Sequence, residues 1–329
     1  MSSNTSSLSR RSALIGALGA GAALAAMGLP GRPALAAAPM LGAAKPTVYR
    51  FKLGTYEVTT ILDGAIQLDG PHPIFGADQK PEDVQRLAGE NFLPTSRMAI
   101  SFSPVLVNTG SELILFDAGN GAARRPNAGA LRATLASAGY TPEQIDVVVV
   151  THFHPDHIGG LMEDGKPAYP NARYVTGQTE YDFWTPAERA SGPTENVHKL
   201  VQSNVVPFAE KTTFLKGGQS VTSGVTAVES FGHTPGHMAY HIESEGKRLM
   251  VTADVANHYV VSLQRPDWHV RFDMDKQKAA DARKSLFGMI AADKIAFTGY
   301  HMPFPNVGYV EPMGSGFRYV AAGYQMDLG

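Results

Sequence analysis

Apolar and polar positions along the chain predict strands and helices in turn. Residues 145–151 form a β-branched run with four consecutive valines, which indicates a strand buried on both faces. Helical patterns at residues 131–138 and 276–292 follow short turns. We expect a short helix near residues 180–184 and further strands at residues 48–53, 58–63, 103–108, 113–116, 172–176, 225–230, 238–242, 248–252 and 294–298.

The alternation of strands and helices continues to the end of the chain without an internal repeat or a convincing linker. We therefore expect a single α/β domain over residues 47–329, with a sandwich core covered by helices.

The first 37 residues follow a different pattern. Arg10 and Arg11 precede an uncharged stretch rich in Ala, Gly and Leu, and residues 34–36 suit signal peptidase. We interpret residues 1–37 as a twin-arginine export signal and residues 38–46 as a short leader, which predicts a periplasmic or secreted protein. An uncleaved membrane anchor is the alternative, but the stretch is short and weakly apolar, so we expect no stable membrane insertion after cleavage.

Composition narrows the chemistry. The chain is 43% hydrophobic and 18% charged, with a formal net charge of -2 and no long basic run, so a nucleic-acid partner is not indicated. There is no cysteine, which excludes disulfides, thiolate metal sites and cysteine nucleophiles. A tightly held metal must therefore use histidine and carboxylate ligands.

Four side chains of ligand type directly follow the valine run. His152 and His154 are two residues apart in an extended segment, so they project to one side. Asp156 and His157 come after the turn and can face back toward them. Burying four such side chains within six residues would be costly without a cation, so the pattern favours a metal site over a solvated polar loop.

Three more candidates also follow predicted strands: His233, Asp254 and His301. Each alone is a weak signal, because a histidine after a strand is more often a structural residue. Their shared placement after strands makes a joint role as metal ligands more convincing.

At these residues the chain resembles the metallo-β-lactamase superfamily, with His-x-His-x-Asp-His, Gly-His-Thr-x-Gly-His, an isolated Asp and an isolated His in order. The resemblance implies an αββα sandwich and two divalent metal ions, which we expect to be zinc. It further implies that one ion is held by His152, His154 and His233, the other by Asp156, His157 and His301, with Asp254 between them.

Within that superfamily the chain is most similar to methyl parathion hydrolases and related exported lactonases, over about residues 47–324. Those hydrolases place an aromatic side chain on the substrate pocket after the position of Asp117, where this chain has Arg124. Phe183 and Trp184 are our other candidates for the pocket wall. Asp117 is a candidate for orienting a ligand histidine through its ring N–H, or alternatively for capping a turn.

The expected activity is hydrolysis of lactones or esters, with phosphotriesters as a related activity, by attack of a metal-bridging hydroxide on a small-molecule substrate. Asp156 and Asp254 would act as catalytic ligands, and either could relay a proton. The alternatives are a non-catalytic metal-binding protein and an iron-dependent redox protein of the same fold. The resemblance also implies a homodimer.

Overall fold

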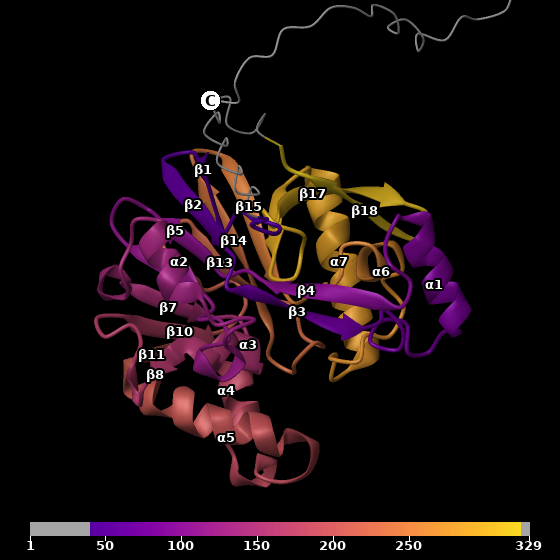
Figure 1. The fold of residues 1–329 in the computed structure, drawn as a ribbon. Helices are drawn as coiled ribbons and strands as arrows, with labels where there is room; N and C mark the ends of the chain where they lie inside the picture. Colours follow the sequence, from indigo (N-terminus) through magenta and orange to yellow (C-terminus); the bar gives the residue numbers. More distant parts are fainter. Residues whose placement is uncertain (1–39, 324–329) are drawn as a thin grey trace, which may run out of the picture. The chain divides into compact units, whose positions relative to one another are not determined.

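The strands form two seven-stranded sheets in the computed structural model, which describes residues 40–323 (Figure 1). The first sheet contains strands from the earlier part of the chain. The four strands at one edge pair antiparallel, and the later strands pair parallel. The valine strand lies in the parallel half, between two neighbours, and its four side chains are all buried. In spatial order the sheet contains β1 (Val48–Leu53), β2 (Tyr56–Ile61), β5 (Val105–Asn108), β6 (Leu113–Phe116), β7 (Val147–Val150), β10 (Arg173–Gly177) and β11 (Thr212–Leu215).

The second sheet is built from the later part of the chain. Neighbouring strands in this sheet pair antiparallel, except for β15 and β16, which pair parallel. In spatial order it contains β12 (Ser220–Thr222), β13 (Val225–Glu229), β14 (Met238–Ser244), β15 (Lys247–Ala253), β16 (Ala296–Gly299), β17 (Val307–Met313) and β18 (Gly316–Ala321).

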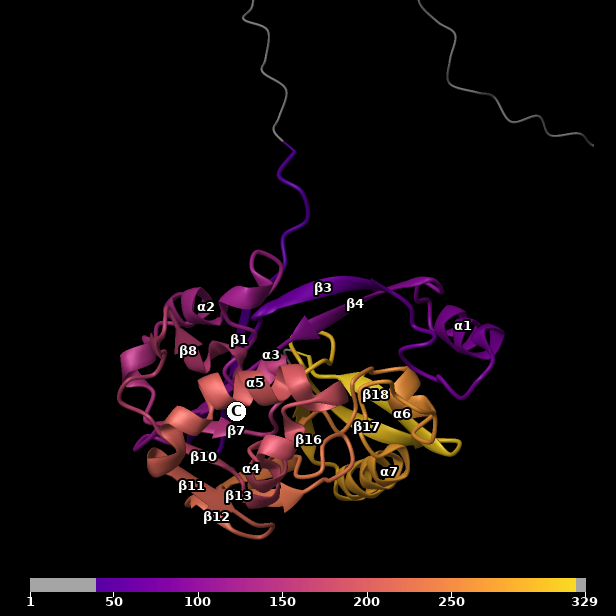
Figure 2. The same ribbon diagram turned by 90° about the horizontal axis from the view of Figure 1, so that it is seen from below.

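Three layers of apolar packing explain why the sheets and helices stack. Val149 and Phe116 from the first sheet pack with Tyr240 and Val251 from the second in the buried layer between them. One outer face packs against α2 (Leu131–Ser137), α3 (Pro155–Ile158), α4 (Gln178–Trp184) and α5 (Glu195–Asn204). The other packs against α6 (Val261–Gln264) and α7 (Lys276–Asp293). Figure 2 shows the two groups of helices on opposite sides, which confirms the αββα sandwich.

A separate antiparallel pair crosses the face of the molecule toward α1 (Pro81–Glu90): β3 (Gly64–Asp69) with β4 (Arg97–Phe102) (Figures 1 and 2). This pair is not hydrogen-bonded into either large sheet. We call it the β3–β4 arm. A second small pair is β8 (Met162–Glu163) with β9 (Lys166–Pro167). Short 3-10 turns complete the described chain: Ala122–Arg124, Pro142–Gln144, Gly159–Leu161, Ala187–Arg189, Gly192–Thr194 and Val206–Lys211.

The described chain from Lys45 onward forms one compact unit. The predicted export signal, residues 1–37, lies outside the described residues. Between residues 40 and 323, no helix is long and apolar enough to cross a membrane.

Most of the expected elements occur within a few residues of their predicted ends. The predicted strand at residues 103–108 begins at Val105, and the strand at residues 294–298 begins at Ala296, because Lys294 takes the left-handed conformation that ends α7. The sequence analysis did not find the β3–β4 arm, α5, α6 or strands β11, β12, β17 and β18.

Candidate metal centre

The seven predicted ligands lie at strand ends in both sheets. His152 and His154 follow β7, and α3 then carries Asp156 and His157. The other three follow strands of the second sheet: His233 after β13, Asp254 after β15 and His301 after β16. Since β15 and β16 are parallel, their carboxyl ends meet at one edge, which brings the last two residues together.

The seven side chains form two overlapping groups, in each of which the ligand atoms lie within 4.8 Å of one another. One group is His152, His154, His233 and Asp254; the other is Asp156, His157, Asp254 and His301. Oδ2 of Asp254 lies 3.3 Å from Nε2 of His233 and 3.0 Å from Nε2 of His301. Oδ1 of the same carboxylate lies 3.3 Å from Nε2 of His157. The structure therefore brings all seven predicted ligand residues together, in two groups that share Asp254.

Polar contacts at the back of two ligand rings leave the other nitrogen of each of these rings free for a metal. Nδ1 of His301 lies 2.8 Å from the carbonyl oxygen of Ser101, and Nδ1 of His157 lies 2.8 Å from Oδ2 of Asp117. An acceptor at Nδ1 places the ring proton there and leaves the Nε2 lone pair directed at the group. Asp117 therefore lies where it can orient a ligand histidine.

The ring nitrogens that point into the two groups are better suited to binding metal ions than to hydrogen-bonding with one another. Nε2 of His152 is buried and makes no hydrogen bond within residues 40–323. Nε2 of His233 faces Nδ1 of His154 at 2.9 Å, so two ring nitrogens meet where only one can carry a proton. Buried lone pairs in this arrangement are costly unless a cation receives them.

The environment shifts the pKa values of these rings in opposite directions. Burial lowers the pKa of His154 to about 3. For His233, burial also favours the neutral ring, but the carboxylates of Asp254 and Asp273 outweigh it and raise the pKa to about 9. A metal must therefore displace a proton from His233, which makes metal binding depend on pH.

Sequence reasoning missed Asp273. Its Oδ1 lies 2.9 Å from Nδ1 of His233, and its Oδ2 accepts a hydrogen bond of 2.8 Å from the buried guanidinium of Arg283 on α7. Arg283 also donates to the carbonyl oxygens of Val255 and Pro266. One arginine thus holds the segment that follows Asp254, and no motif in the sequence marks it.

Glu180 is a second missed residue. This buried carboxylate on α4 accepts hydrogen bonds from the backbone N–H of Phe153, between two ligand histidines, and from Thr234 Oγ1 and the N–H of Gly236, just after His233. Burial raises its pKa. Glu180 therefore ties together the two loops that supply three ligands to the first group.

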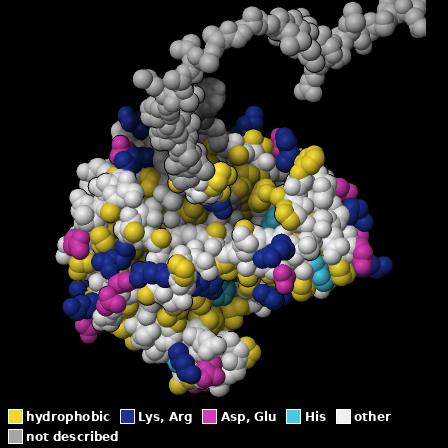
Figure 3. Space-filling model, viewed as in Figure 1, with side chains coloured by type: hydrophobic (Ala, Val, Ile, Leu, Met, Phe, Trp, Pro, Cys, Tyr) yellow, Lys and Arg dark blue, Asp and Glu magenta, His cyan; other side chains and the backbone are white. Residues whose placement is uncertain are grey.

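A cavity of about 350 Å³ opens above the metal groups. We call the seven ligand residues the floor; five of them line the cavity: His154, Asp156, His233, Asp254 and His301. Its apolar wall is formed by Ile66 and Leu68 on β3, Ile100 and Phe102 on β4, and Phe272. Arg124, Asn257 and Arg271 also line the cavity. Figure 3 shows histidine among hydrophobic side chains, with Lys and Arg nearby, on the face that carries the β3–β4 arm.

The pocket candidates from the sequence have different outcomes. Arg124 lines the cavity, with its guanidinium carbon 5.5 Å from the centre of the Phe102 ring. Phe183 and Trp184 do not line it; they pack in the layer between the first sheet and its helices. Trp184 is only 2% exposed, and its ring N–H donates to Glu180, so it acts in that layer instead of on the pocket wall.

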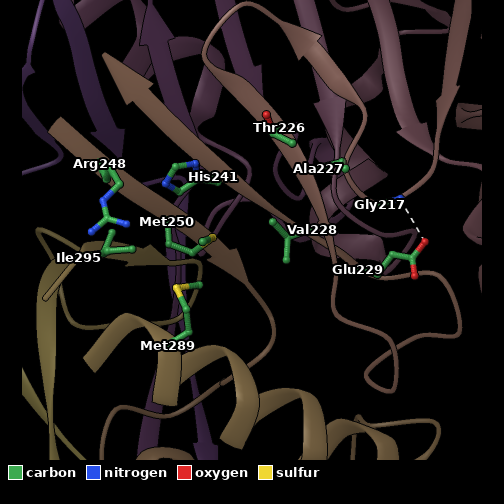
Figure 4. Close-up of a pocket in the computed structure, with 11 residues that line it drawn as sticks. Gly217, Thr226, Ala227, Val228, Glu229, His241, Arg248, Met250, Met289 and Ile295 are labelled. Carbon is green, nitrogen blue, oxygen red and sulfur yellow. Dashed lines mark hydrogen bonds between the residues drawn. The ribbon is translucent and has the colours of Figure 1, made fainter. Parts of the chain in front are cut away.

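A second hollow lies on the outer face of the second sheet beside α7 and shares no residue with the metal pocket (Figure 4). Arg248 and His241 lie at one end, and Glu229 lies at the other, where it accepts a hydrogen bond from the N–H of Gly217. Its Arg248 already pairs with Asp293. The hollow contains no group of potential metal ligands.

The family model of the metallo-beta-lactamase superfamily matches residues 103–292, and the chain therefore belongs to this superfamily. An "N-acyl homoserine lactonase" of Bacillus sp is 29% identical over 111 residues, which cover 34% of this chain and 38% of that relative. The chain thus spans well under half the length of this curated relative.

Two solved structures are similar over most of the fold. "AidC, a Dizinc Quorum-Quenching Lactonase" in complex with a product has a TM-score of 0.76 and 26% identity, covering 84% of this chain and 98% of that chain. "Hydrolase AbOPH in beta lactamase superfamily" has a TM-score of 0.79 and 25% identity, covering 85% and 99%. Together with the two ligand groups, the family and the dizinc neighbour support two metal ions here, with zinc as the ion indicated.

Proposed function

We propose that the protein is a metal-dependent hydrolase that opens lactones, with N-acyl homoserine lactones as the substrate class. The observation that carries this proposal is the pair of ligand groups sharing Asp254 beneath a cavity with an apolar wall. The wall suits an acyl chain, and the floor suits the carbonyl that is attacked. The similar lactonases support the substrate class.

Two metal ions held by these two groups of ligands would supply a hydroxide nucleophile at neutral pH and would polarise the substrate oxygen. The chain's own residues position that chemistry. Asp254 is held on both sides, by the side-chain amide of Asn257 at 2.9 Å and by its own N–H, which donates to Nε2 of the buried His237. Asp156, which is not fully buried and lines the cavity, is placed to carry a proton to the leaving alcohol.

A phosphotriesterase activity remains part of the proposal, as a secondary activity. Attack on phosphorus needs the same floor, so it requires no further catalytic group. Arg124 stands on the wall where methyl parathion hydrolases are expected to place an aromatic side chain, and a guanidinium offers less apolar area to an aryl triester. We therefore expect lactones and esters to be better substrates than methyl parathion.

The experiment combines metal analysis with a substrate panel. The metal content of the purified protein is measured as isolated and again after loading with zinc, and turnover is followed on N-acyl homoserine lactones of different chain lengths, aryl esters and methyl parathion. We expect about two metal equivalents per chain and lactone hydrolysis that a chelator abolishes. Two bound zinc ions without turnover of any substrate would indicate a non-catalytic metal-binding protein; bound iron with redox activity would indicate the other alternative.

Export through the twin-arginine pathway and a homodimer also remain proposals. Arg10 and Arg11 stand before a weakly hydrophobic stretch, which supports the export route. The double substitution Arg10→Lys with Arg11→Lys should leave an uncleaved precursor in the cytoplasm. Sedimentation of the mature protein tests the dimer.

A further inference from the structure

Two arginines line the metal pocket, and each lies over one of the pocket's phenylalanine rings. The guanidinium carbon of Arg124 is 5.5 Å from the centre of the Phe102 ring, and that of Arg271 is 5.3 Å from the centre of the Phe272 ring. Both arginines and both rings line the same cavity. Stacking on an aromatic face holds a guanidinium in place while its N–H groups stay available.

Neither guanidinium has an acid or carbonyl partner in the part of the chain that the structure describes. The neighbouring Arg125 differs: it makes two hydrogen bonds to the carboxylate of Glu163, at 2.7 and 3.0 Å, outside the pocket. Arg124 is half-buried, so its unpaired guanidinium is not simply a solvated surface group. Its N–H donors remain free to bind a ligand that enters the cavity.

The charge of the pocket supports the same conclusion. The acids that line it, Asp156 and Asp254, belong to the metal floor. No other acid of the described chain lines the cavity, so no lining carboxylate beyond the metal floor offsets the positive charge of Arg124 and Arg271. A cleft with surplus positive charge and apolar walls raises the local concentration of anionic substrates.

We propose that this site prefers lactones or esters that carry a carboxylate at the far end of an aliphatic chain, with Arg124 and Arg271 binding that carboxylate. The proposal rests on the hydrolase function proposed above and specifies its substrate. The aliphatic part contacts Ile66 and Ile100, and the carboxylate accepts hydrogen bonds from a guanidinium, which suits carboxylate geometry better than an ammonium would.

A matched pair of esters tests the preference. Para-nitrophenyl hexanoate and mono-para-nitrophenyl adipate have acyl chains of equal length that end in a methyl group and a carboxylate. With zinc-loaded protein, we expect kcat/KM to be about tenfold higher for the adipate ester, and higher salt to reduce this ratio. Arg124→Met with Arg271→Met should bring the ratio close to one, and each single substitution should lower it partly.

The matched control is Arg189→Met. Arg189 also stacks on a phenylalanine, with its guanidinium carbon 3.9 Å from the centre of the Phe183 ring, but it does not line the metal pocket. This variant should keep the wild-type ratio. A wild-type ratio near one, or a double variant that keeps the full preference, would overturn the proposal.

A binding measurement separates this inference from the hydrolase proposal. Calorimetry with adipate and hexanoate on the zinc-loaded protein requires no turnover. We expect adipate to bind about tenfold more tightly than hexanoate in the wild type and equally well in the double variant. If no lactone or ester of the panel is hydrolysed but this difference is found, the hydrolase proposal fails and the carboxylate preference stands. Equal binding of both acids to the wild type rejects the preference.

Discussion

The floor of the metal pocket and its wall are attached to the sandwich in different ways. The floor follows the ends of β7, β13, β15 and β16, strands that are paired on both sides in the large sheets. The wall is carried mainly by the β3–β4 arm, which pairs only with itself, and by Phe272 in the segment between α6 and α7. The same cavity therefore joins the most restrained part of the fold to one of the less restrained parts.

This difference indicates a division of roles. Metal ligands must be held within a few tenths of an ångström, so they belong on rigid strand ends backed by buried hydrogen bonds such as those of Asp117 and Asp273. A wall that only selects the substrate tolerates substitution, because its side chains contribute contact area instead of ligand geometry. Substitutions in the floor should therefore affect metal content and rate together, whereas substitutions in the wall should affect substrate preference alone.

The largest effect is expected from Asp254→Asn in the floor. The amide keeps the shape of the side chain but loses the charge that the two ligand groups share. We expect metal content to fall from about two equivalents to one or fewer, and kcat/KM for lactones to fall on the order of a thousandfold, or several kcal/mol. Elemental analysis and lactone kinetics measure both changes.

Asp182→Asn is the matched control, because it makes the same substitution at an exposed position on α4, outside the metal pocket. It should leave metal content and rate unchanged. Full activity of Asp254→Asn with two bound metals would contradict the bridging position of Asp254.

A smaller effect is expected from Asp273→Asn, which acts through His233. The carboxylate accepts from Nδ1 of His233, and Arg283 holds it in place. An amide in its place weakens the orientation of the ring, so zinc affinity should fall about tenfold to a hundredfold. Competition with a chromogenic chelator measures this affinity.

Asp267→Asn lies in the same segment but on the surface, where its carboxylate pairs with Lys284. It serves as the control and should keep the wild-type affinity. If Asp273→Asn binds zinc as tightly as the wild type, the hydrogen bond to His233 has no part in metal binding.

The same division explains which features the sequence predicted. The floor residues stand next to strands with strong apolar patterns, and local spacing within residues 152–157 already places four ligand side chains together. Asp273 and Glu180 gave no such signal, because their roles depend on hydrogen bonds to residues 40 and 27 positions away in the chain. A lone acid in a loop or helix does not reveal such a partner.

The wall could have been predicted in part. Ile66 and Leu68 alternate with polar positions, and so do Ile100 and Phe102, which is the two-residue period of a half-buried strand. Trp184 was predicted for the wall from the family resemblance, and its aromatic side chain fits a pocket as well as a core. The residue type alone cannot distinguish a pocket wall from a core. The buried hydrogen bond from Trp184 to Glu180 shows that this side chain belongs to the core.

Ile66→Ser should alter substrate preference without altering metal content. The side chain lines the cavity from β3, and its loss removes apolar contact with a long acyl chain. We expect kcat/KM for long-chain lactones to fall about tenfold relative to short-chain lactones, which corresponds to about 1.4 kcal/mol. Kinetics on a series of chain lengths measures this ratio.

Gln67→Ser is the control on the same strand, because neighbouring residues of a strand point to opposite faces and Gln67 is exposed. It should keep the wild-type preference. A loss of bound metal in Ile66→Ser would show that the wall and the floor are not independent.

The smallest effect is expected outside the pocket, at the ion pair of Glu163 with Arg125. The hydrogen bond from Arg125 lowers the pKa of the Glu163 carboxyl below its usual 4.5, so the pair contributes stability above that pH and loses it as the pH falls through the lowered pKa. Because the pair is partly exposed, Glu163→Gln should lower the free energy of unfolding by at most about 1 kcal/mol at neutral pH.

Urea unfolding of the wild type and of Glu163→Gln, both in the presence of a chelator, measures this difference. Protonation of the histidine ligands then affects both proteins equally. The difference should shrink toward zero as the pH falls below 4.5, while the ratio of adipate to hexanoate ester hydrolysis at neutral pH stays at the wild-type value. A change in that ratio would mean that Arg125, once released from Glu163, reaches the pocket that Arg124 lines.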